Sequence, residues 1–218
     1  MPPYYWQSYI CRGPQSLWQW DQIEAENRHK REPESEPLPY VDGYLPEPAS
    51  AIRLARECDI PHILPAAFYH LSRLSIYDDW AEARQCLDIH SSRYEGLDLG
   101  RRTAKWSLLT ANDFISLPKG RAKLRVATAE RRVFELDNHE SEDHSSSGCS
   151  SLKRSELLLE IRKACRYSRD ILLTTREYME RSDFSDNVCQ YCCSRIRDSL
   201  SRFRRHLWVK LPDFLSLE

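Results

Sequence analysis

Cysteine and histidine residues in the C-terminal half have spacing that could form a zinc site. Cys189 and Cys192 are separated by two residues, and His144 and Cys149 are separated by four. Zinc takes four thiolate or imidazole ligands in a tetrahedron, and a C-x-x-C at the start of a helix presents two thiols on one side. These four residues therefore predict a structural Zn site of the Cys3His type, which would tie the 137–150 loop to the last helix.

Core packing is the alternative role for the same cysteines. At about 100° per residue, Cys189 and Cys192 both fall on the apolar side of the helix expected there, where a free cysteine behaves as a small hydrophobic residue. Cys193 lies at the edge of that stripe and is the least suited to be a ligand, while His139 is a spare candidate. The two half-sites are 40 residues apart, which is long for a compact zinc module. Core thiols are the favoured interpretation, and the zinc site stays open.

The sequence contains none of the common catalytic motifs. It has no G-x-S-x-G, no H-E-x-x-H, no P-loop and no G-x-G-x-x-G. Cys58 and His62 could form a thiol–imidazole pair, but a nucleophile also needs an orienting group and an oxyanion site. A core cysteine beside a surface histidine is favoured, and Asp78 and Asp79 suit a helix N-terminus better than paired catalysis. The chain is therefore expected not to be an enzyme.

One stretch of the chain, residues 195–208, is concentrated in basic residues. Arg195, Arg202 and Arg205 are predicted to share a polar helix face that could follow a phosphate backbone. Such a face is more often simply solvated, and residues 119–132 carry the same two interpretations. Because 32 basic and 33 acidic residues nearly cancel, the whole chain offers no general attraction to nucleic acid. Nucleic-acid contact is the minor alternative.

Helices are predicted along most of the chain after residue 46. A short one begins at Pro48 and ends near Asp59, with Cys58 in its apolar stripe, and a second opens at Pro65 and buries residues as far as Ile76. A third is expected over about 78–87, followed by a loop over 88–104.

Four further helices are expected beyond a buried Trp106. Thr110 and Asp113 form a capping box, Pro118 interrupts, and a charged helix runs over about 119–136. After the polar loop 137–150, longer helices cover about 151–181 and 186–208, and Pro212 stops the chain before a short apolar tail. The last helix has the clearest apolar stripe, with spacings of four, four, four, three and four: Val188, Cys192, Ile196, Leu200, Phe203 and Leu207.

The composition indicates a mainly α protein, an irregular multi-helix bundle. The chain has 218 residues, 41% of them apolar, and only six Gly, too few for the many tight turns of a barrel or sandwich. No window is apolar enough to span a bilayer and no secretory signal is present, so the eight cysteines indicate reduced thiols or metal ligands in an intracellular protein. The organisation expected is an aromatic, Pro-rich and poorly ordered segment, 1–46, before one helical domain, 47–218.

The N-terminal segment carries residue types that often serve as partner-binding groups. Trp6, Trp18 and Trp20 could anchor an interface, and the five prolines of residues 31–48 favour an extended ligand-like conformation. The same tryptophans could equally fold back onto the helical body.

The stretch over residues 51–80, AIRLARECDIPHILPAAFYHLSRLSIYDDW, resembles the region after the BTB/POZ fold in fungal, chiefly basidiomycete, BTB-domain proteins. The segments 106–109 (WSLL) and 119–121 (KGR) are similar to that group's W-x-L-L and xGR segments. The C-x-x-C of 189–192 and the LW, LP-x-F and final Leu of 207–217 are similar to its closing pattern. The resemblance covers about 45–218.

The resemblance implies the helical extension of a BTB protein without its BTB fold. A complete BTB fold would have to precede residue 51, and the 50 residues there lack its strand–helix alternation. BTB proteins act as adaptors and scaffolds, so the resemblance implies a non-enzymatic role in protein–protein interaction. The alternative is a helical module held by structural zinc that contacts nucleic acid.

Overall fold

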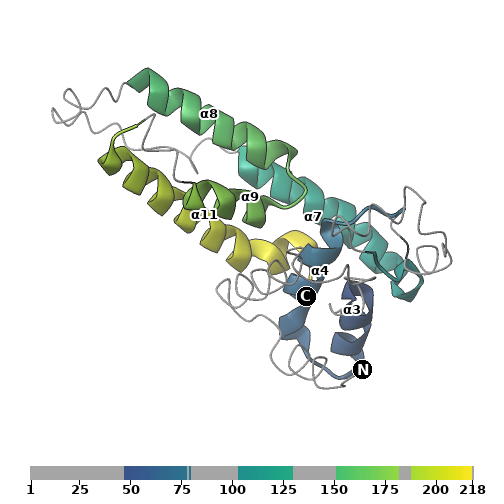
Figure 1. Cartoon of the computed structure of the whole chain (residues 1–218). Coiled ribbons are helices and arrows are strands. Elements are labelled where there is room, and N and C mark those ends of the chain that lie inside the picture. The colour runs from purple at the N-terminus through teal and green to yellow at the C-terminus, as the bar shows by residue number, and fades with distance from the viewer. Residues whose placement is uncertain (1–46, 78, 80–102, 130–150, 182–187, 218) are drawn as a thin grey trace, which may run out of the picture. The chain divides into compact units, whose positions relative to one another are not determined.

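The computed structural model describes residues 47–77, 79, 103–129, 151–181 and 188–217 (Figure 1). Helices dominate these ranges, and the β-type contact within them is an isolated bridge between Asp79 and Ala104. The prediction of a mainly α, multi-helix fold is confirmed. The helices are α3 (Pro48–Glu57), α4 (Leu64–Ser72), α7 (Ala111–Ala129), α8 (Ser151–Tyr167), α9 (Ile171–Glu180) and α11 (Gln190–Leu215), with 3-10 turns at Pro61–Ile63 and Trp106–Leu108.

The chain divides into two compact units. The first comprises Met1–Arg121 and Leu211–Glu218, and the second comprises Ala122–Lys210. The division falls inside α7 and inside α11, so each of these helices belongs partly to both units. The expected N-terminal segment 1–46 and the 137–150 loop lie outside the described residues.

In the first unit, a buried carboxylate sets the start of α3. The Glu47 side chain is almost fully buried and accepts hydrogen bonds from the backbone N–H groups of Ala49 (2.9 Å) and Ser50 (2.6 Å). These amides have no partner within the helix, so the side chain acts as an N-cap, and Pro48 follows at the first helical position as predicted. The same carboxylate accepts the N–H of Lys105 at 2.9 Å. Glu47 therefore also fixes a segment that is distant in sequence.

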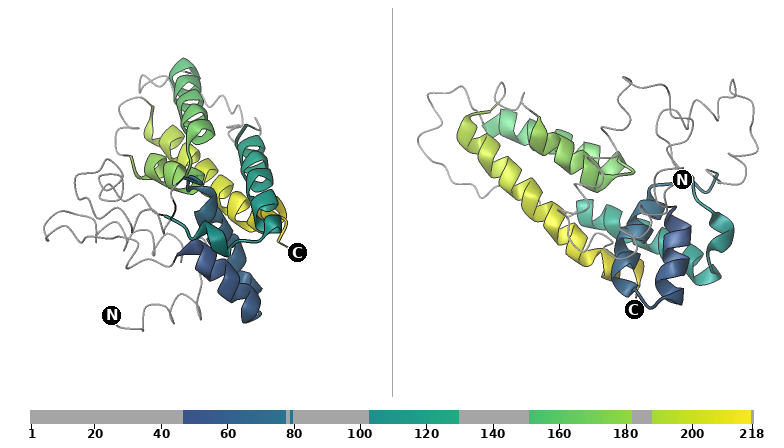
Figure 2. Two further views of the ribbon diagram at one scale, coloured as in Figure 1. Left: turned by 90° about the vertical axis from the view of Figure 1, so that its right-hand side faces the viewer. Right: turned by 60° about the horizontal axis from the view of Figure 1, so that its bottom comes forward.

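Helices α3 and α4 lie side by side (Figure 2) and pack closely against each other. Ile52 of α3 and Phe68 and Leu71 of α4 are at most 1% exposed. These residues were predicted to be buried, and that prediction is confirmed. The predicted burial of Ile76 is wrong, since α4 ends at Ser72 and Ile76 is 56% exposed.

The predicted capping box at the start of α7 is present and has an additional partner. The N–H of Thr110 donates to the Asp113 carboxylate at 2.8 Å, and the N–H of Asp113 donates to the Thr110 hydroxyl at 3.3 Å. Arg56 of α3 donates through both terminal nitrogens to the two oxygens of Asp113, which is 1% exposed. The Arg56 guanidinium also lies over the ring of Phe68, 5.9 Å from its centre. This group of contacts connects α3, α4 and α7.

These hydrogen bonds change the acidity of both charged groups. Burial alone would raise the pKa of Asp113, but the hydrogen bonds from Arg56 and Thr110 outweigh it and lower that pKa below its ordinary value. The hydrogen bond to Asp113 correspondingly raises the pKa of Arg56. Asp113 is therefore an ionised carboxylate at neutral pH.

Two prolines that were predicted to interrupt or stop helices lie inside them. Helix α7 continues through Pro118, and α11 continues through Pro212 to Leu215. A proline inside a helix costs about 3 kcal/mol because it removes one hydrogen bond and crowds the preceding turn. Leu211 and Leu215 are completely buried on either side of Pro212, and this packing offsets the local cost.

The Lys119-Gly120-Arg121 segment lies where α7 meets the last turn of α11. A Cβ atom placed on Gly120 would collide with the Leu215 side chain, so the absence of a side chain permits the close approach of the two helices. Arg121 donates to the backbone carbonyls of Ser72 and Leu74 at 2.7 Å each. Those carbonyls lie at and just beyond the end of α4, where no backbone N–H of the helix is available to them. The Arg121 guanidinium donates the missing hydrogen bonds.

In the second unit, the long helix predicted over 151–181 is instead two helices. Helix α8 ends at Tyr167 and α9 begins at Ile171. Asp170 caps α9 by accepting the N–H of Leu173 at 3.0 Å, and the Ser168 hydroxyl accepts the N–H of Asp170 at 2.9 Å. Short polar side chains compete with helical hydrogen bonds in this way, which accounts for the break.

Helix α11 buries the apolar stripe predicted for it. All six residues of the stripe are at most 3% exposed. Helix α9 lies against α11 (Figure 1), and the nearly buried Arg204 donates through Nε to the carbonyl of Leu172 at 3.1 Å. The core of the second unit therefore forms between α11 and the α8–α9 pair.

Within the predicted third helix, residues 78–87, the structure describes Asp79 alone. Asp79 forms a parallel bridge with Ala104. The residues that would follow it in the predicted helix are not described, so that helix stays a prediction. Asp78 and residues 80–102 lie outside the described residues.

Candidate functional site

Three cysteines gather around the first turn of α11. Cys189 directly precedes the helix and is partly exposed, whereas Cys192 and Cys193 are buried, and all three are free thiols. Nη1 of Arg154 in α8 donates to Sγ of Cys192 at 3.8 Å, and the Cys193 thiol donates to the carbonyl of Val188 at 3.5 Å. Cys192 occupies the apolar stripe as the core-thiol interpretation requires.

The structure describes two of the four predicted zinc ligands. Cys189 and Cys192 lie together at the start of α11, but Cys149 and His144 lie outside the described residues, as does the spare candidate His139. Within the described ranges, no three His, Cys, Asp or Glu side chains are grouped as a metal site requires. Two thiols would supply half of a tetrahedral zinc site, so structural zinc stays a prediction.

Cys58 and His62, the suggested thiol–imidazole pair, are both exposed, Cys58 at the end of α3 and His62 in the 3-10 turn that follows. Cys58 is the C-cap residue of α3, and Asp59 after it has a positive φ of 53°, which turns the chain sharply. The prediction that Cys58 is a core residue is wrong, because the helix ends before the thiol can share its buried face. His62 is at the surface, as predicted.

The described cysteines should differ widely in reactivity. Complete burial raises the pKa of the Cys165 thiol to about 12, and a protonated, inaccessible thiol is a poor nucleophile. We expect a thiol reagent at pH 8 to modify Cys58 quickly and Cys165 only after unfolding, as followed by mass spectrometry of peptides over time. Equal rates at Cys58 and Cys165 in the folded protein would contradict this assignment of burial.

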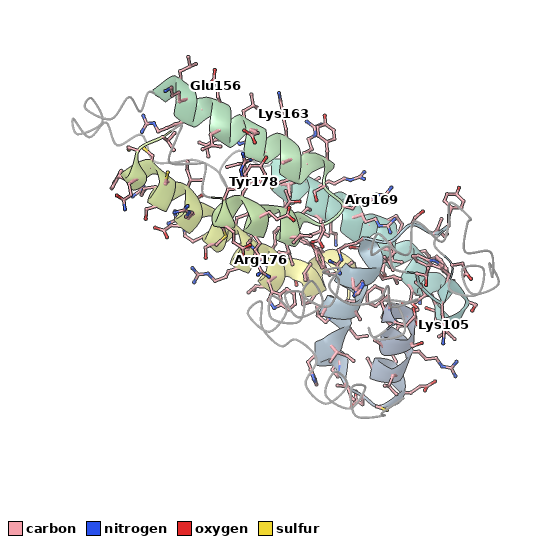
Figure 3. All side chains as sticks on the ribbon, in the orientation of Figure 1. Lys105, Glu156, Lys163, Arg169, Arg176 and Tyr178 are labelled. Carbon is pink, nitrogen blue, oxygen red and sulfur yellow. The ribbon has the colours of Figure 1, made fainter. Side chains whose placement is uncertain are left out.

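A polar cluster that sequence patterns did not indicate joins α8 to α9. The Tyr178 hydroxyl donates to Oε1 of Glu160 at 2.9 Å, and Nη1 of Arg181 donates to the same oxygen at 3.0 Å (Figure 3 labels Tyr178). The Arg181 guanidinium also lies over the Tyr178 ring at 5.0 Å. Burial, followed by the hydrogen bond to Glu160, raises the pKa of Tyr178 to about 12.

This cluster serves to hold the helices rather than to move protons. Tyr178 stays neutral because its pKa is high, and Glu160 already accepts two hydrogen bonds. Arg197 of α11 completes the arrangement by donating to the carbonyls of Met179 and Arg181, each at 3.1 Å. A sequence offers one signal for such a clamp, an aromatic and a basic residue three positions apart on a helix.

The basic stretch 195–208 is divided between structural and exposed roles. Arg197 and Arg204 donate to backbone carbonyls of the α9 region. Arg202 and Arg205 are exposed and Arg195 is partly exposed, which agrees with the predicted polar face opposite the stripe. In residues 119–132, Lys119 and Lys123 are exposed on α7, and 130–132 lie outside the described residues. Contact with nucleic acid stays a prediction for both stretches.

Exposed apolar side chains are the remaining candidates for function. Among the described residues they include adjacent pairs, Ile76 with Tyr77 and Phe114 with Ile115, and two leucines of α8, Leu152 and Leu159. The predicted aromatic anchors Trp6, Trp18 and Trp20 lie outside the described residues. Within the described ranges, no helix is both long and apolar enough to cross a bilayer.

The chain matches no protein-family model, no curated protein sequence and no solved structure.

Proposed function

We propose that the chain is a non-enzymatic protein–protein interaction protein of the adaptor or scaffold type that acts inside the cell. The observation that carries the proposal is the exposure of large apolar side chains on helices and beside them. Tyr77 is 86% exposed beside Ile76, and Leu152 is 66% exposed on α8. Exposed apolar groups that lie close together are typical of surfaces that bind other proteins.

The buried polar groups support the same proposal. Glu47, Asp113 and Arg204 are all nearly buried, and each is engaged with backbone groups or with an ion-pair partner that connects helices. Hydrogen bonds of this kind give these three groups a structural role in the fold. The proposed relation to the helical region of BTB proteins rests on the sequence segments quoted above, and analogy with that class favours an adaptor.

Affinity purification with mass spectrometry tests the proposal directly. The tagged full chain, residues 1–218, should recover a reproducible set of proteins from a lysate of the source cells that the tag alone does not recover. A parallel purification with residues 47–218 tests whether Trp6, Trp18 and Trp20 contribute to that set. Recovery of nothing reproducible by either protein would overturn the proposed function.

A further inference from the structure

The outer face of α8 presents two leucines to solvent. Leu152 is 66% and Leu159 49% exposed, and their separation of seven residues places them on the same side of the helix. The opposite side of α8 is buried, with Ile161 and Cys165 at 0% exposure. A partner helix that packed along this side of α8 would bury both exposed leucines.

The C-terminal half of the same face is basic. Lys163 and Arg166 are exposed and follow Leu159 by four and seven positions, which keeps them near the line of the two leucines. Figure 3 shows Lys163 and Glu156 on the edge of α8 that points away from α9. The other acid of α8, Glu160, is already engaged by Arg181 and Tyr178. Glu156 lies between the two leucines along the helix, so positive charge predominates beyond Leu159, over the C-terminal half of the face.

An aromatic side chain stands at the end of this face. Tyr167 is 79% exposed, and the Arg166 guanidinium lies 6.0 Å from the centre of its ring. Tyrosine and arginine are the residue types most enriched among those that dominate binding energy in protein interfaces. Together these groups define what we call the α8 face: Leu152, Leu159, Lys163, Arg166 and Tyr167.

We propose that the α8 face binds an acidic amphipathic segment of another protein, with apolar side chains over the two leucines and carboxylates beside Lys163 and Arg166. The inference rests on the proposed function and identifies the chemistry of one partner. A nucleic acid would neutralise the basic groups through its phosphates but would leave Leu152 and Leu159 in water. A second copy whose α8 packed in parallel would bring the same positive groups toward one another, and an antiparallel copy is one of the outcomes that the test distinguishes.

A designed peptide tests the chemistry in isolation from any natural partner. The probe is a fluorescein-labelled helical peptide with leucines along one face and glutamates beside them, and its binding to the full chain is followed by fluorescence anisotropy. Leu159→Ser alone, and Lys163→Glu with Arg166→Glu, should each weaken binding about tenfold or more. A second probe with its leucines replaced by serine should bind about tenfold more weakly.

Matched controls separate this site from general electrostatic attraction. Arg202→Glu with Arg205→Glu reverses two equally exposed charges on α11 and should change binding less than about twofold. Far-ultraviolet circular dichroism and the urea midpoint of each variant should equal those of the wild type, because every substituted side chain is exposed. Equal losses on α8 and α11 would overturn the assignment of the α8 face.

The remaining outcomes each overturn the inference in a different way. Absence of binding by the leucine-containing peptide rejects the acidic amphipathic partner. Equal or tighter binding of a labelled 20-base-pair DNA duplex that is lost with Lys163→Glu and Arg166→Glu assigns the face to nucleic acid. Concentration-dependent self-association that is lost with Leu159→Ser assigns it to a second copy. If the wild-type chain and the α8 variants purify the same proteins from lysate, the α8 inference fails while the proposed function stands.

Discussion

Replacing Leu207 by alanine is expected to lower the free energy of unfolding by about 2–5 kcal/mol. Leu207 is 0% exposed and is the last residue of the α11 stripe, so the substitution removes buried methyl groups and leaves a cavity that close-packed neighbours fill only in part. Urea denaturation followed by circular dichroism should show a lower midpoint with an unchanged slope, because the surface exposed on unfolding is nearly the same.

The control for this prediction is the same substitution at an exposed leucine. Leu159 is 49% exposed on α8 in the same unit, and Leu159→Ala should change the free energy of unfolding by less than about 0.5 kcal/mol. Similar losses for the two substitutions would mean that α8 buries its outer face in the free protein. That result would contradict both the assigned core and the proposed α8 face.

Leu207 also illustrates which features a sequence can predict. The stripe from Val188 to Leu207 repeats every three or four residues over five turns, and a pattern of that length is difficult to satisfy except by an amphipathic helix. Its burial, together with the mainly α class, was therefore predictable from residue spacing alone. The Thr110–Asp113 capping box was predictable for a similar reason, since both of its hydrogen bonds are local.

The helix boundaries that were missed depend on interactions that local rules do not contain. Pro118 and Pro212 were expected to end helices, and packing of residues such as Leu215 maintains α11 beyond its proline. Conversely, a strong apolar pattern concealed the break between α8 and α9, where Ser168 and Asp170 make local hydrogen bonds. Local propensity is a weak guide when tertiary contacts are worth several kcal/mol.

The candidate sites were less predictable than the fold because their partners are far apart in sequence. Arg56 and Asp113 are separated by 57 residues, and nothing in either segment indicates the other. The C-x-x-C of Cys189 and Cys192 was recognisable, but the same thiols suit a zinc site and an apolar stripe equally well. The spacing of residues in a sequence identifies candidate ligands and catalytic groups. Their function depends on which residues, distant in sequence, they contact in the fold.

Replacing Asp113 by asparagine is expected to lower the free energy of unfolding by about 1–3 kcal/mol at pH 7. The substitution keeps the size of the side chain but removes the charge that holds both terminal nitrogens of Arg56. Because the Arg56 side chain is 41% exposed, solvent screens the pair, and we expect a smaller loss than for a fully buried ion pair. Urea midpoints for the two proteins measure the difference.

The difference between the two proteins should depend on pH in a defined direction. The pKa of Asp113 is lowered in the folded protein, so the folded state favours the ionised carboxylate. That contribution to stability is fully present above the pKa of an unfolded aspartate, about 4, and is lost as the pH falls through the lower folded value. The wild type should therefore begin to lose its advantage over Asp113→Asn as the pH falls below about 4, and should lose more of it at lower pH. Comparing the two proteins cancels the contributions of the other carboxylates.

An exposed ion pair on the same helix provides the control. Arg53 and Glu57 of α3 are paired at 2.7 Å, with 58% and 57% of their side chains exposed, so Glu57→Gln should leave the urea midpoint unchanged within error. Arg56→Met should reproduce most of the loss seen with Asp113→Asn, and the two substitutions together should cost less than the sum of the separate losses because they remove one shared interaction. Strict additivity, or a difference between wild type and Asp113→Asn that does not change with pH, would show that the carboxylate stabilises the first unit without Arg56. The capping box would then be sufficient to hold the start of α7, and α3 would be fixed by its packing against α4 and by the contacts of Glu47.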